Sequence, residues 1–325
     1  MNEKHPVRAR RLALLAALAL LAAPAAQAQA WPAKPLRLVV AAGAGSSVEV
    51  FARLVGDRLS QSLGQPVVVE PRPGANGIIA GQVVATARND GYTLLFAGNS
   101  ALVIAPLMAK ALPYDGEKAF VPVAPVSYVP LAIAVPSGSA IRSLQDLLAQ
   151  AKGQEMFFAT PGAASLSRLI GENLNEKAGT RLVNVAFPSS GPAQTDVMGG
   201  RIPVLIDGLG GIAPHVKSGR MRLLAVSTAT RFKEFPDVPT IAEVVPGLVV
   251  PGINSIVAPA GTPPEALDLL NRRINEITGD PAIADRFLGL GGEAARGSRD
   301  DLDKILREQR STFRRLIQAA NIKEE

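Results

Sequence analysis

The residues of this chain best suited to chemistry lie in turns that follow an apolar run and precede a helical pattern. In the first such turn, Gly43, Gly45, Ser46 and Ser47 come shortly after the apolar run 36–40. A turn of this kind points free backbone N–H groups at one spot, beside the positive end of the following helix. It therefore predicts an anion site, which would suit either a dinucleotide or a small organic acid.

The dinucleotide interpretation rests on the glycine spacing. Gly43-x-Gly45-x-x-Val48 approaches the dinucleotide fingerprint, and the second expected strand ends in Glu70, where a ribose-binding carboxylate would stand. Val48 occupies the position that needs glycine or alanine, and its side chain would push the helix off the strand. Because Glu70 also runs straight into the rigid turn at Pro71, the sequence favours the organic acid.

A second turn repeats this arrangement. Thr160 and Ala164 lie in a turn after the expected strand 156–159, and Ser165 opens the helical pattern that follows. Ser165 would present the same backbone and hydroxyl donors as Ser46. The alternative for both serines is a plain N-cap, in which the side chain accepts a hydrogen bond from the helix backbone. The two roles are compatible.

Polar side chains also follow two other expected strands. Asn99 and Ser100 come after the strand 92–97, and Asp207 comes after the short apolar strand 204–206. An acid at the carboxyl end of a strand in an α/β fold often faces a ligand. The alternatives are a turn role for Asn99 and Ser100, and a cap at Gly208 for Asp207.

Two more residues have competing interpretations. Glu49 lies one turn into the first helix, where it either faces the ligand or only matches the positive end of the helix dipole. Phe187 either forms an apolar wall of the site or belongs to the core. Glu49 and Asp207 together could do acid–base chemistry across a closed cleft. An exported hydrolase or racemase is therefore the enzymatic alternative.

Other catalytic signals are missing from the sequence. It has no cysteine and no Gly-x-Ser-x-Gly motif, and its two histidines are His5 and His215. A nucleophile with its base, or a metal site of His and Cys ligands, needs such residues together. We therefore expect no enzymatic activity, no metal and no cofactor.

The first thirty residues have the pattern of a secretory signal peptide. Basic residues between Lys4 and Arg11 precede a 15-residue apolar stretch, 12–26, and small-x-small cleavage sites follow at 26–28 and 28–30. A membrane anchor is the alternative, but a bilayer span needs roughly 20 apolar residues. Because the chain has no cysteine for lipid attachment, the sequence predicts a soluble periplasmic protein.

The charge of the chain argues against a nucleic-acid partner. The net charge is +6, and four basic residues and one acidic residue in the segment 1–30 supply half of it. The remainder has no block of lysine and arginine. Aromatic residues make up only 4% of the sequence, so few rings are present to stack on bases.

Alternating strands and helices must position these residues. The βαβ rhythm predicts a parallel sheet with helices on both faces. We expect strands at 36–40, 66–70, 92–97, 156–159, 182–186, 204–206 and 223–227. We expect helices at 48–63, 77–87, 143–151, 165–178, 193–198, 212–218, 264–278 and 301–320.

Two proline-rich segments interrupt this alternation. The apolar run 121–135 contains three prolines, a spacing that suits an extended connector along a sheet edge and not a central strand. The segment 236–264 is expected to be the return crossing. Two crossings would leave two lobes with a cleft between them, residues 31–126 with 250–325 and residues 127–249.

Short motifs run through the chain in order from Trp31 onward. They are Trp31-Pro-x-Lys-Pro35, Ala52-Arg53, Leu63-Gly-Gln-Pro-Val-Val-Val-Glu70, Arg72-Pro-Gly-Ala-Asn-Gly77, Asp90-Gly-Tyr-Thr-Leu-Leu95, Leu112-Pro-Tyr-Asp115, Gly199-Gly200, Asp237-Val-Pro-Thr240 and Ala258-Pro-Ala-Gly-Thr-Pro263. In these motifs the chain resembles the Bug-type extracytoplasmic solute receptors of the tripartite tricarboxylate transporter family. The resemblance implies a two-lobed, type II periplasmic binding protein that closes around a small organic acid. It also implies a membrane permease or a sensor as partner, and we expect a monomer.

The resemblance places the ligand loops of that family on this chain. The first loop corresponds to residues 41–49, and the loop after the third strand to 97–100. The loop of the second lobe corresponds to 160–165. The Tyr-Lys-Gly segment of the family corresponds to Phe187-Pro188-Ser189, and its strand-end acid to Asp207.

This chain departs from the family pattern in these loops. Of the first loop only Gly45 is kept, and the family lysine is Pro188 here. Backbone N–H groups still capture an anion after such changes, because they need geometry and not side chains. Loss of a cation, with Glu49 and Asp207 present, favours a ligand less anionic than a di- or tricarboxylate, or one that carries an amine.

Overall fold

The structure of the chain is a computed structural model that describes residues 31–43, 46–250, 252–319 and 322. The expected signal peptide, 1–30, and the loop residue Gly45 lie outside the described residues. Residues 34–325 form one compact unit. Within the described ranges, no helix combines the length and the apolar character that a membrane crossing requires.

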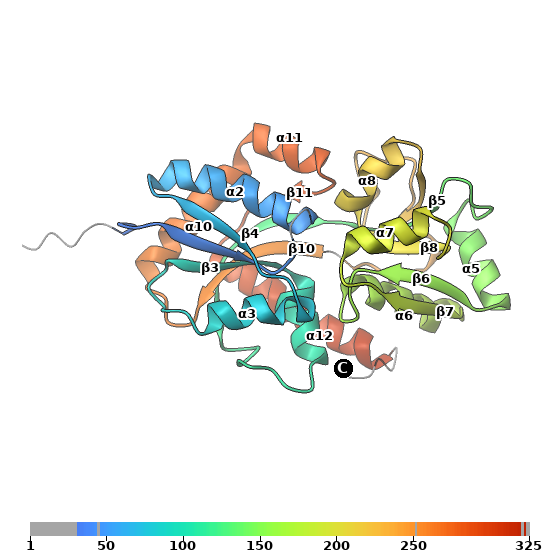
Figure 1. Ribbon diagram of the computed structural model, residues 1–325, viewed down its shortest axis with the longest axis horizontal. Helices are drawn as coiled ribbons and strands as arrows, with labels where there is room; N and C mark the ends of the chain where they lie inside the picture. The colour runs from blue at the N-terminus through green and yellow to red at the C-terminus, as the bar shows by residue number, and fades with distance from the viewer. Residues whose placement is uncertain (1–30, 44–45, 251, 320–321, 323–325) are drawn as a thin grey trace, which may run out of the picture. The chain divides into compact units, whose positions relative to one another are not determined.

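Two β-sheets, each flanked by helices, make up this unit (Figure 1). The elements of the six-stranded sheet and its surroundings are β1 (Leu36–Val40), α2 (Ser47–Leu63), β2 (Val67–Pro71), η1 (Ala75–Gly77), α3 (Ile78–Ala85), β3 (Thr93–Gly98), η2 (Ser100–Ile104), α4 (Ala105–Met108), β4 (Phe120–Val129), β10 (Gly252–Pro259), α10 (Pro264–Gly279), α11 (Pro281–Gly289), β11 (Glu293–Ala294) and α12 (Arg299–Ala319). Those of the five-stranded sheet are β5 (Leu131–Pro136), α5 (Leu144–Gly153), β6 (Met156–Thr160), α6 (Leu166–Ala178), β7 (Leu182–Ala186), α7 (Ser190–Met198), β8 (Val204–Gly208), α8 (Leu209–Lys217), β9 (Met221–Val226) and α9 (Ile241–Val244).

The sheets are mixed, not parallel throughout as the βαβ rhythm suggested. Their strand orders are β11-β4-β10-β3-β1-β2 and β7-β6-β8-β5-β9. β1 pairs in parallel with β2 and β3, and β6 with β7 and β8, as expected of βαβ units. β10 and β5 run antiparallel to both of their neighbours. Each of them enters its sheet from the other sheet, so it starts at the edge where the βαβ strands finish.

The expectation that the run 121–135 avoids central strand positions was wrong. It forms β4, which lies between β11 and β10, and β5, which lies between β8 and β9. Pro122 and Pro125 stand opposite β10 at the positions where the register shifts. Such bulges tolerate proline because its missing N–H is not needed in the ladder. The crossing itself was predicted correctly, since β4 ends at Val129 and β5 begins at Leu131.

The return segment 236–264 also holds more structure than a connector. It contains α9 and β10, and β10 is an eight-residue strand buried along its whole length between β4 and β3. The helix α11, the strand β11 and the η2–α4 turns were not expected either. Short apolar runs without a clear period look alike in a connector and in a buried strand, so pairing with distant strands decides between them.

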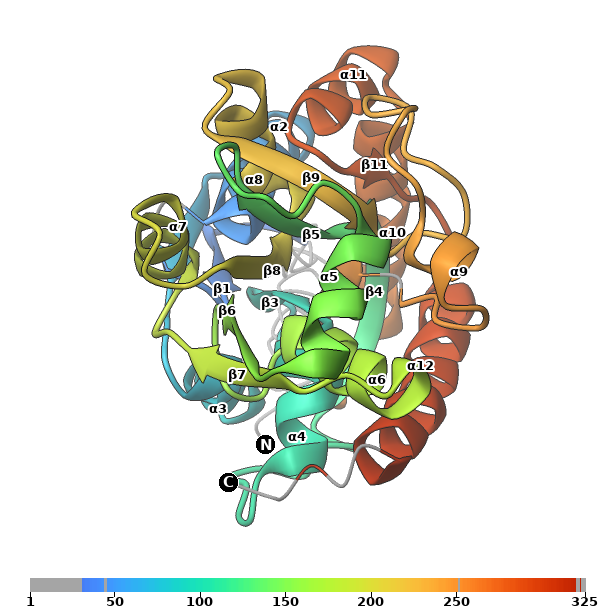
Figure 2. The same ribbon diagram turned by 90° about the vertical axis from the view of Figure 1, so that its right-hand side faces the viewer.

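Most ends of the expected helices were predicted more accurately, because capping is a local interaction, but α7 and α8 begin at Ser190 and Leu209 and not at the expected 193 and 212. Gly64 ends α2 in the left-handed region, at φ 65°. Ser143 begins α5 with a capping box, in which its hydroxyl accepts from the backbone N–H of Asp146 and the Asp146 carboxylate accepts in return. α2 and α10 cover one face of the six-stranded sheet, and α3 and α12 the other (Figure 1). α7 and α8 lie on one face of the five-stranded sheet and α5 and α6 on the other (Figure 2).

Candidate functional site

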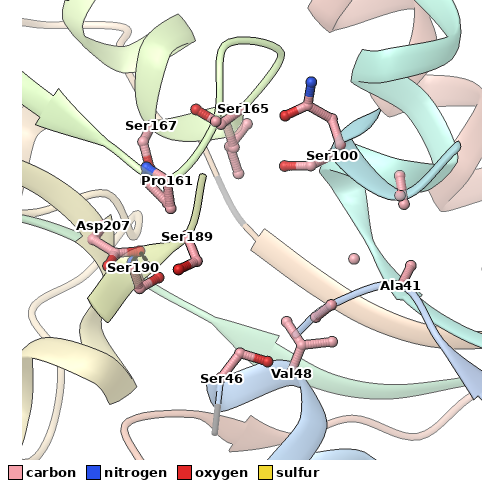
Figure 3. Close-up of a pocket in the computed structure, with 18 of the residues that line it drawn as sticks. Ala41, Ser46, Val48, Ser100, Pro161, Ser165, Ser167, Ser189, Ser190 and Asp207 are labelled. Carbon is pink, nitrogen blue, oxygen red and sulfur yellow. Dashed lines mark hydrogen bonds between the residues drawn. The ribbon is translucent and has the colours of Figure 1, made fainter. Parts of the chain in front are cut away.

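A cavity of about 560 Å³ opens where the carboxyl ends of β1, β3, β6 and β8 meet (Figure 3). Its lining comes from both sheets, as the βαβ topology requires. The polar residues among its described lining are Ser46, Ser47, Asn76, Asn99, Ser100, Ser165, Ser167, Ser189, Ser190, Asp207 and Asn254. None of the described lining residues is a lysine, an arginine or a histidine.

Five α-helices of the described residues begin at residues that line this cavity. The residues before their first turns are Ser46 for α2, Gly77 for α3, Ser165 for α6, Ser189 for α7 and Gly208 for α8. The first N–H groups of a helix lack partners within the helix, and its dipole places a partial positive charge there. The cavity is therefore surrounded by backbone donors although no cationic side chain is among its described lining.

The two serines singled out by the sequence are N-caps. The hydroxyl of Ser46 accepts a hydrogen bond from the backbone N–H of Glu49 at 3.2 Å, and that of Ser165 accepts from Arg168 at the same distance. Both serines also line the cavity. A capping bond uses one lone pair of a hydroxyl, and its O–H remains able to donate, so the local role leaves room for contact with a ligand.

Asp207 is the buried acid of the cavity. Its side chain accepts hydrogen bonds from the Ser190 hydroxyl at 3.2 Å, the backbone N–H of Gly208 at 2.7 Å and the Gln194 amide at 3.2 Å. Burial raises the pKa of Asp207 above its ordinary value, and these three donors oppose that shift. Among the described residues, the carboxylate is thus held by neutral donors only.

The substitution Asp207→Asn should make the stability of the folded protein fall less as the pH rises. Because the folded-state pKa of Asp207 is raised, the stability linked to its proton is present below the unfolded value of about 3.9. That stability is lost as the pH rises through the raised pKa. Relative to the unchanged chain, the variant should therefore gain stability as the pH increases. Melting temperatures measured across the pH range test this, and a pH-independent difference would contradict it.

Asn99 lines the cavity, but both polar atoms of its side chain form hydrogen bonds within the protein. Its Oδ1 accepts from the backbone N–H of Ile253 at 2.6 Å, and its Nδ2 donates to Oε1 of Gln309 at 2.7 Å. These bonds join the end of β3 to β10 and to α12. The turn role that the sequence left open is therefore replaced by a tertiary one.

The structure brings most of the expected site residues together. Gly43, Ser46, Ser47, Asn99, Ser100, Ser165, Phe187, Ser189 and Asp207 line the cavity. Val48 lines it too (Figure 3). The expectation that its side chain would push α2 away from β1 was therefore wrong, because the side chain faces the cavity.

Three expected site residues do not line the cavity. The carboxylate of Glu49 is paired with Arg53, one turn further along α2. The hydroxyl of Thr160 donates to Oδ1 of Asn184 at 2.8 Å, and Ala164 is buried in the core. Since Glu49 is turned to Arg53, the carboxylate pair on which the acid–base alternative rested does not meet in the cavity.

Sequence reasoning missed the contribution of η1. Gly74, Asn76 and Gly77 line the cavity, and Asn76 has a positive φ of 52°. The motif 72–77 follows the second strand, and the carboxyl ends of parallel strands share one edge of the sheet, which was the available signal. A Cβ on Gly162, in the turn before α6, would overlap Oδ1 of Asn76. The two turns therefore meet across the cavity.

Comparison with known proteins agrees with this architecture. Residues 51–322 match the family described as Tripartite tricarboxylate transporter family receptor. A UPF0065 protein of Bordetella bronchiseptica is 70% identical to this chain, over 97% of this chain and 94% of that protein. Protein BugT of Bordetella pertussis is 35% identical, over 86% of this chain and 87% of that protein.

A solved structure also resembles this fold closely. The structure of Rpa4515 from R. palustris with adipate has a TM-score of 0.86 and 29% sequence identity, covering 90% of this chain and 98% of that chain. The expected two-lobed α/β fold is confirmed, with mixed sheets in place of parallel ones. On the extent of the family match and the 70% identity to a relative that is covered over 94% of its length, the chain belongs to the tripartite tricarboxylate transporter family of receptors.

Proposed function

We propose that this protein is a periplasmic receptor that holds a small organic acid in the cavity beside Asp207. The observation that carries the proposal is the convergence of five helix N-termini, among the described residues, on one cavity of about 560 Å³. Such N-termini bind carboxylates through backbone donors and the helix dipole. The similarity to Rpa4515, a family relative whose structure holds adipate, supports the same class of ligand.

The polar groups of the cavity favour an acid that also carries a hydrogen-bond donor. Asp207 can accept but not donate when it is ionised, and a second carboxylate placed beside it would be repelled. The family lysine position is Pro188, which lines the cavity without a charge. A hydroxyl or ammonium group at the Asp207 end, with a carboxylate at the helix N-termini, therefore matches the site. Each charge-assisted bond contributes roughly 1.5–3 kcal/mol, and a few give about micromolar affinity.

The remaining parts of the proposal concern the receptor cycle. Residues 1–30 would direct export and be removed, and the lobes 31–126 with 250–325 and 127–249 would close on the acid. A permease of the tripartite tricarboxylate type, or a sensor, would recognise the closed monomer. The ligand would be released unchanged, with no catalytic step and no cofactor.

Calorimetric titration tests the proposal. We expect saturable binding of adipate or of its 2-hydroxy or 2-amino derivatives, and no binding of the neutral diamide, because only the acids can use the helix N-termini. Mass spectrometry should recover the bound acid unchanged after long incubation. Binding of the diamide as tightly as the acids, or conversion of the acid to a product, would overturn the proposal.

A further inference from the structure

A line of hydrogen bonds connects Asp207 to the surface of the protein. Nε2 of Gln194 donates to Oδ2 of Asp207 at 3.2 Å, and Oε1 of Gln194 lies 3.1 Å from Nε2 of His215. Nδ1 of His215 lies 2.8 Å from an N–H group of Arg220. Gln194 is 8% exposed and lies on α7, whereas His215 lies on α8.

The chemistry of the two ends gives this line a single direction. Arginine can only donate and an ionised carboxylate can only accept. Nδ1 of His215 must therefore accept from Arg220, which leaves the ring proton on Nε2. That proton is donated to Oε1 of Gln194, so the amide of Gln194 presents its donor to Asp207. Burial and the nearby Arg220 lower the pKa of His215, which favours this neutral ring.

The Gln194 amide fits between Asp207 and His215 because the residue of α8 that faces it is a glycine. Gly211, in the first turn of α8, faces the amide of Gln194, and a Cβ there would lie 2.8 Å from Nε2. Any larger residue would displace the amide from its place between Asp207 and His215. The line thus depends on close approach of the α8 backbone to the Gln194 side chain.

The three bonds to Asp207 leave one acceptor position open. A carboxylate offers about four lone-pair positions, and Ser190, Gly208 and Gln194 occupy three. Asp207 also lines the cavity. Among the described residues no donor occupies the remaining position, and we assign it to a donor on a molecule inside the cavity.

We propose that Gln194 and His215 are positioning residues that hold Asp207 as an acceptor and thereby set a preference for acids with a hydroxyl or ammonium group at that end. This inference rests on the proposed function. His215 acts through Gln194 and lies outside the described lining of the cavity. Without its N–H, the Gln194 amide is free to rotate and turn its oxygen toward Asp207, which would repel that carboxylate and shift it.

Binding selectivity tests the role of His215. Adipate and 2-aminoadipate differ by one donor, and the unchanged chain should prefer 2-aminoadipate at least tenfold. In His215→Phe the preference should fall to threefold or less, while the affinity for adipate stays within threefold. His215→Gln, which can place an amide N–H near the lost ring Nε2, should restore most of it. The matched control Lys217→Met, on the same helix and paired with Glu234, should keep the full preference.

The alternative outcomes are distinguishable. An unchanged preference in His215→Phe, or an equal loss of affinity for both acids, would overturn the positioning role while leaving the receptor function standing. Failure of the unchanged chain to bind either acid would count against the proposed function and remove the basis of the selectivity inference.

Nitrogen NMR tests the direction of the line without any ligand. In the full chain carrying His5→Gln, His215 is the only histidine, so labelled histidine reports it directly. We expect one neutral tautomer, protonated on Nε2, and a changed Nε2 signal in Gln194→Met. A ring protonated on Nδ1 at neutral pH would overturn the inference.

Discussion

Replacing Asn99 with leucine should lower the free energy of unfolding by about 2–6 kcal/mol, because each of two buried polar groups left without a partner costs about 1–3 kcal/mol. Those groups are the backbone N–H of Ile253 and Oε1 of Gln309, which lie 2.6 and 2.7 Å from the Asn99 amide. Asn99 is 4% exposed, so water does not replace the lost bonds easily. The loss should affect the attachment of β10 and α12 to β3.

Denaturant unfolding of the purified variant measures this effect. The neighbouring substitution Ser100→Ala is the matched control, because Ser100 also lines the cavity and its replacement by alanine removes only a hydroxyl. We expect the control to stay within about 0.5 kcal/mol of the unchanged chain, as surface-like substitutions do. Equal stability of Asn99→Leu and Ser100→Ala would show that the Asn99 bridge carries no net energy.

Replacing Gly210 with alanine should weaken ligand binding by about 10–100-fold, since overpacking costs about 1–3 kcal/mol and each 1.4 kcal/mol is tenfold. A Cβ on Gly210 would overlap the carbonyl oxygen of Leu290. Gly210 lies at the start of α8, beside the five-stranded sheet, and Leu290 lies between α11 and β11 of the six-stranded sheet. The clash is relieved when these segments separate, which favours the open form over the closed, ligand-holding one.

The design of this test isolates the contact from helix propensity. Alanine is a better helix former than glycine, so α8 itself should not be destabilised. Gly191→Ala in α7 is the matched control, because a Cβ there meets nothing within 4 Å. Titration with adipate and 2-aminoadipate should show the loss for Gly210→Ala only. An unchanged affinity would mean that the Gly210–Leu290 contact does not contribute to closure.

The serine turns show how far local reasoning reaches into the site. Ser46 and Ser165 were expected at helix starts, either as ligand donors or as caps, and the structure makes both of them caps that line the cavity. Glu49 was also left between two roles, and its pairing with Arg53 is an interaction between residues four apart on one helix. Spacing within one turn predicts such contacts, so the Arg53 partner could have been inferred from the sequence.

The Asn99 bridge and the β10 strand lay beyond local reasoning. Asn99 and Gln309 are 210 residues apart, and no pattern near either residue indicates the other. β10 is an apolar run whose place between β4 and β3 depends on strands distant in sequence. The His215–Gln194 contact is likewise invisible until α7 and α8 are packed side by side.

By itself the sequence determined most of the ends of the expected helices, though not the starts of α7 and α8, and it determined the βαβ units around β1 and β6 and a family resemblance that the comparisons confirmed. These features follow from periodicity, capping and turn chemistry, which act over a few neighbouring residues. Only the tertiary structure decided that β5 and β10 reverse direction, that five helix N-termini of the described residues share one cavity, and that Glu49 stays out of it. Those outcomes depend on which distant segments pack together, and packing is a property of the whole chain.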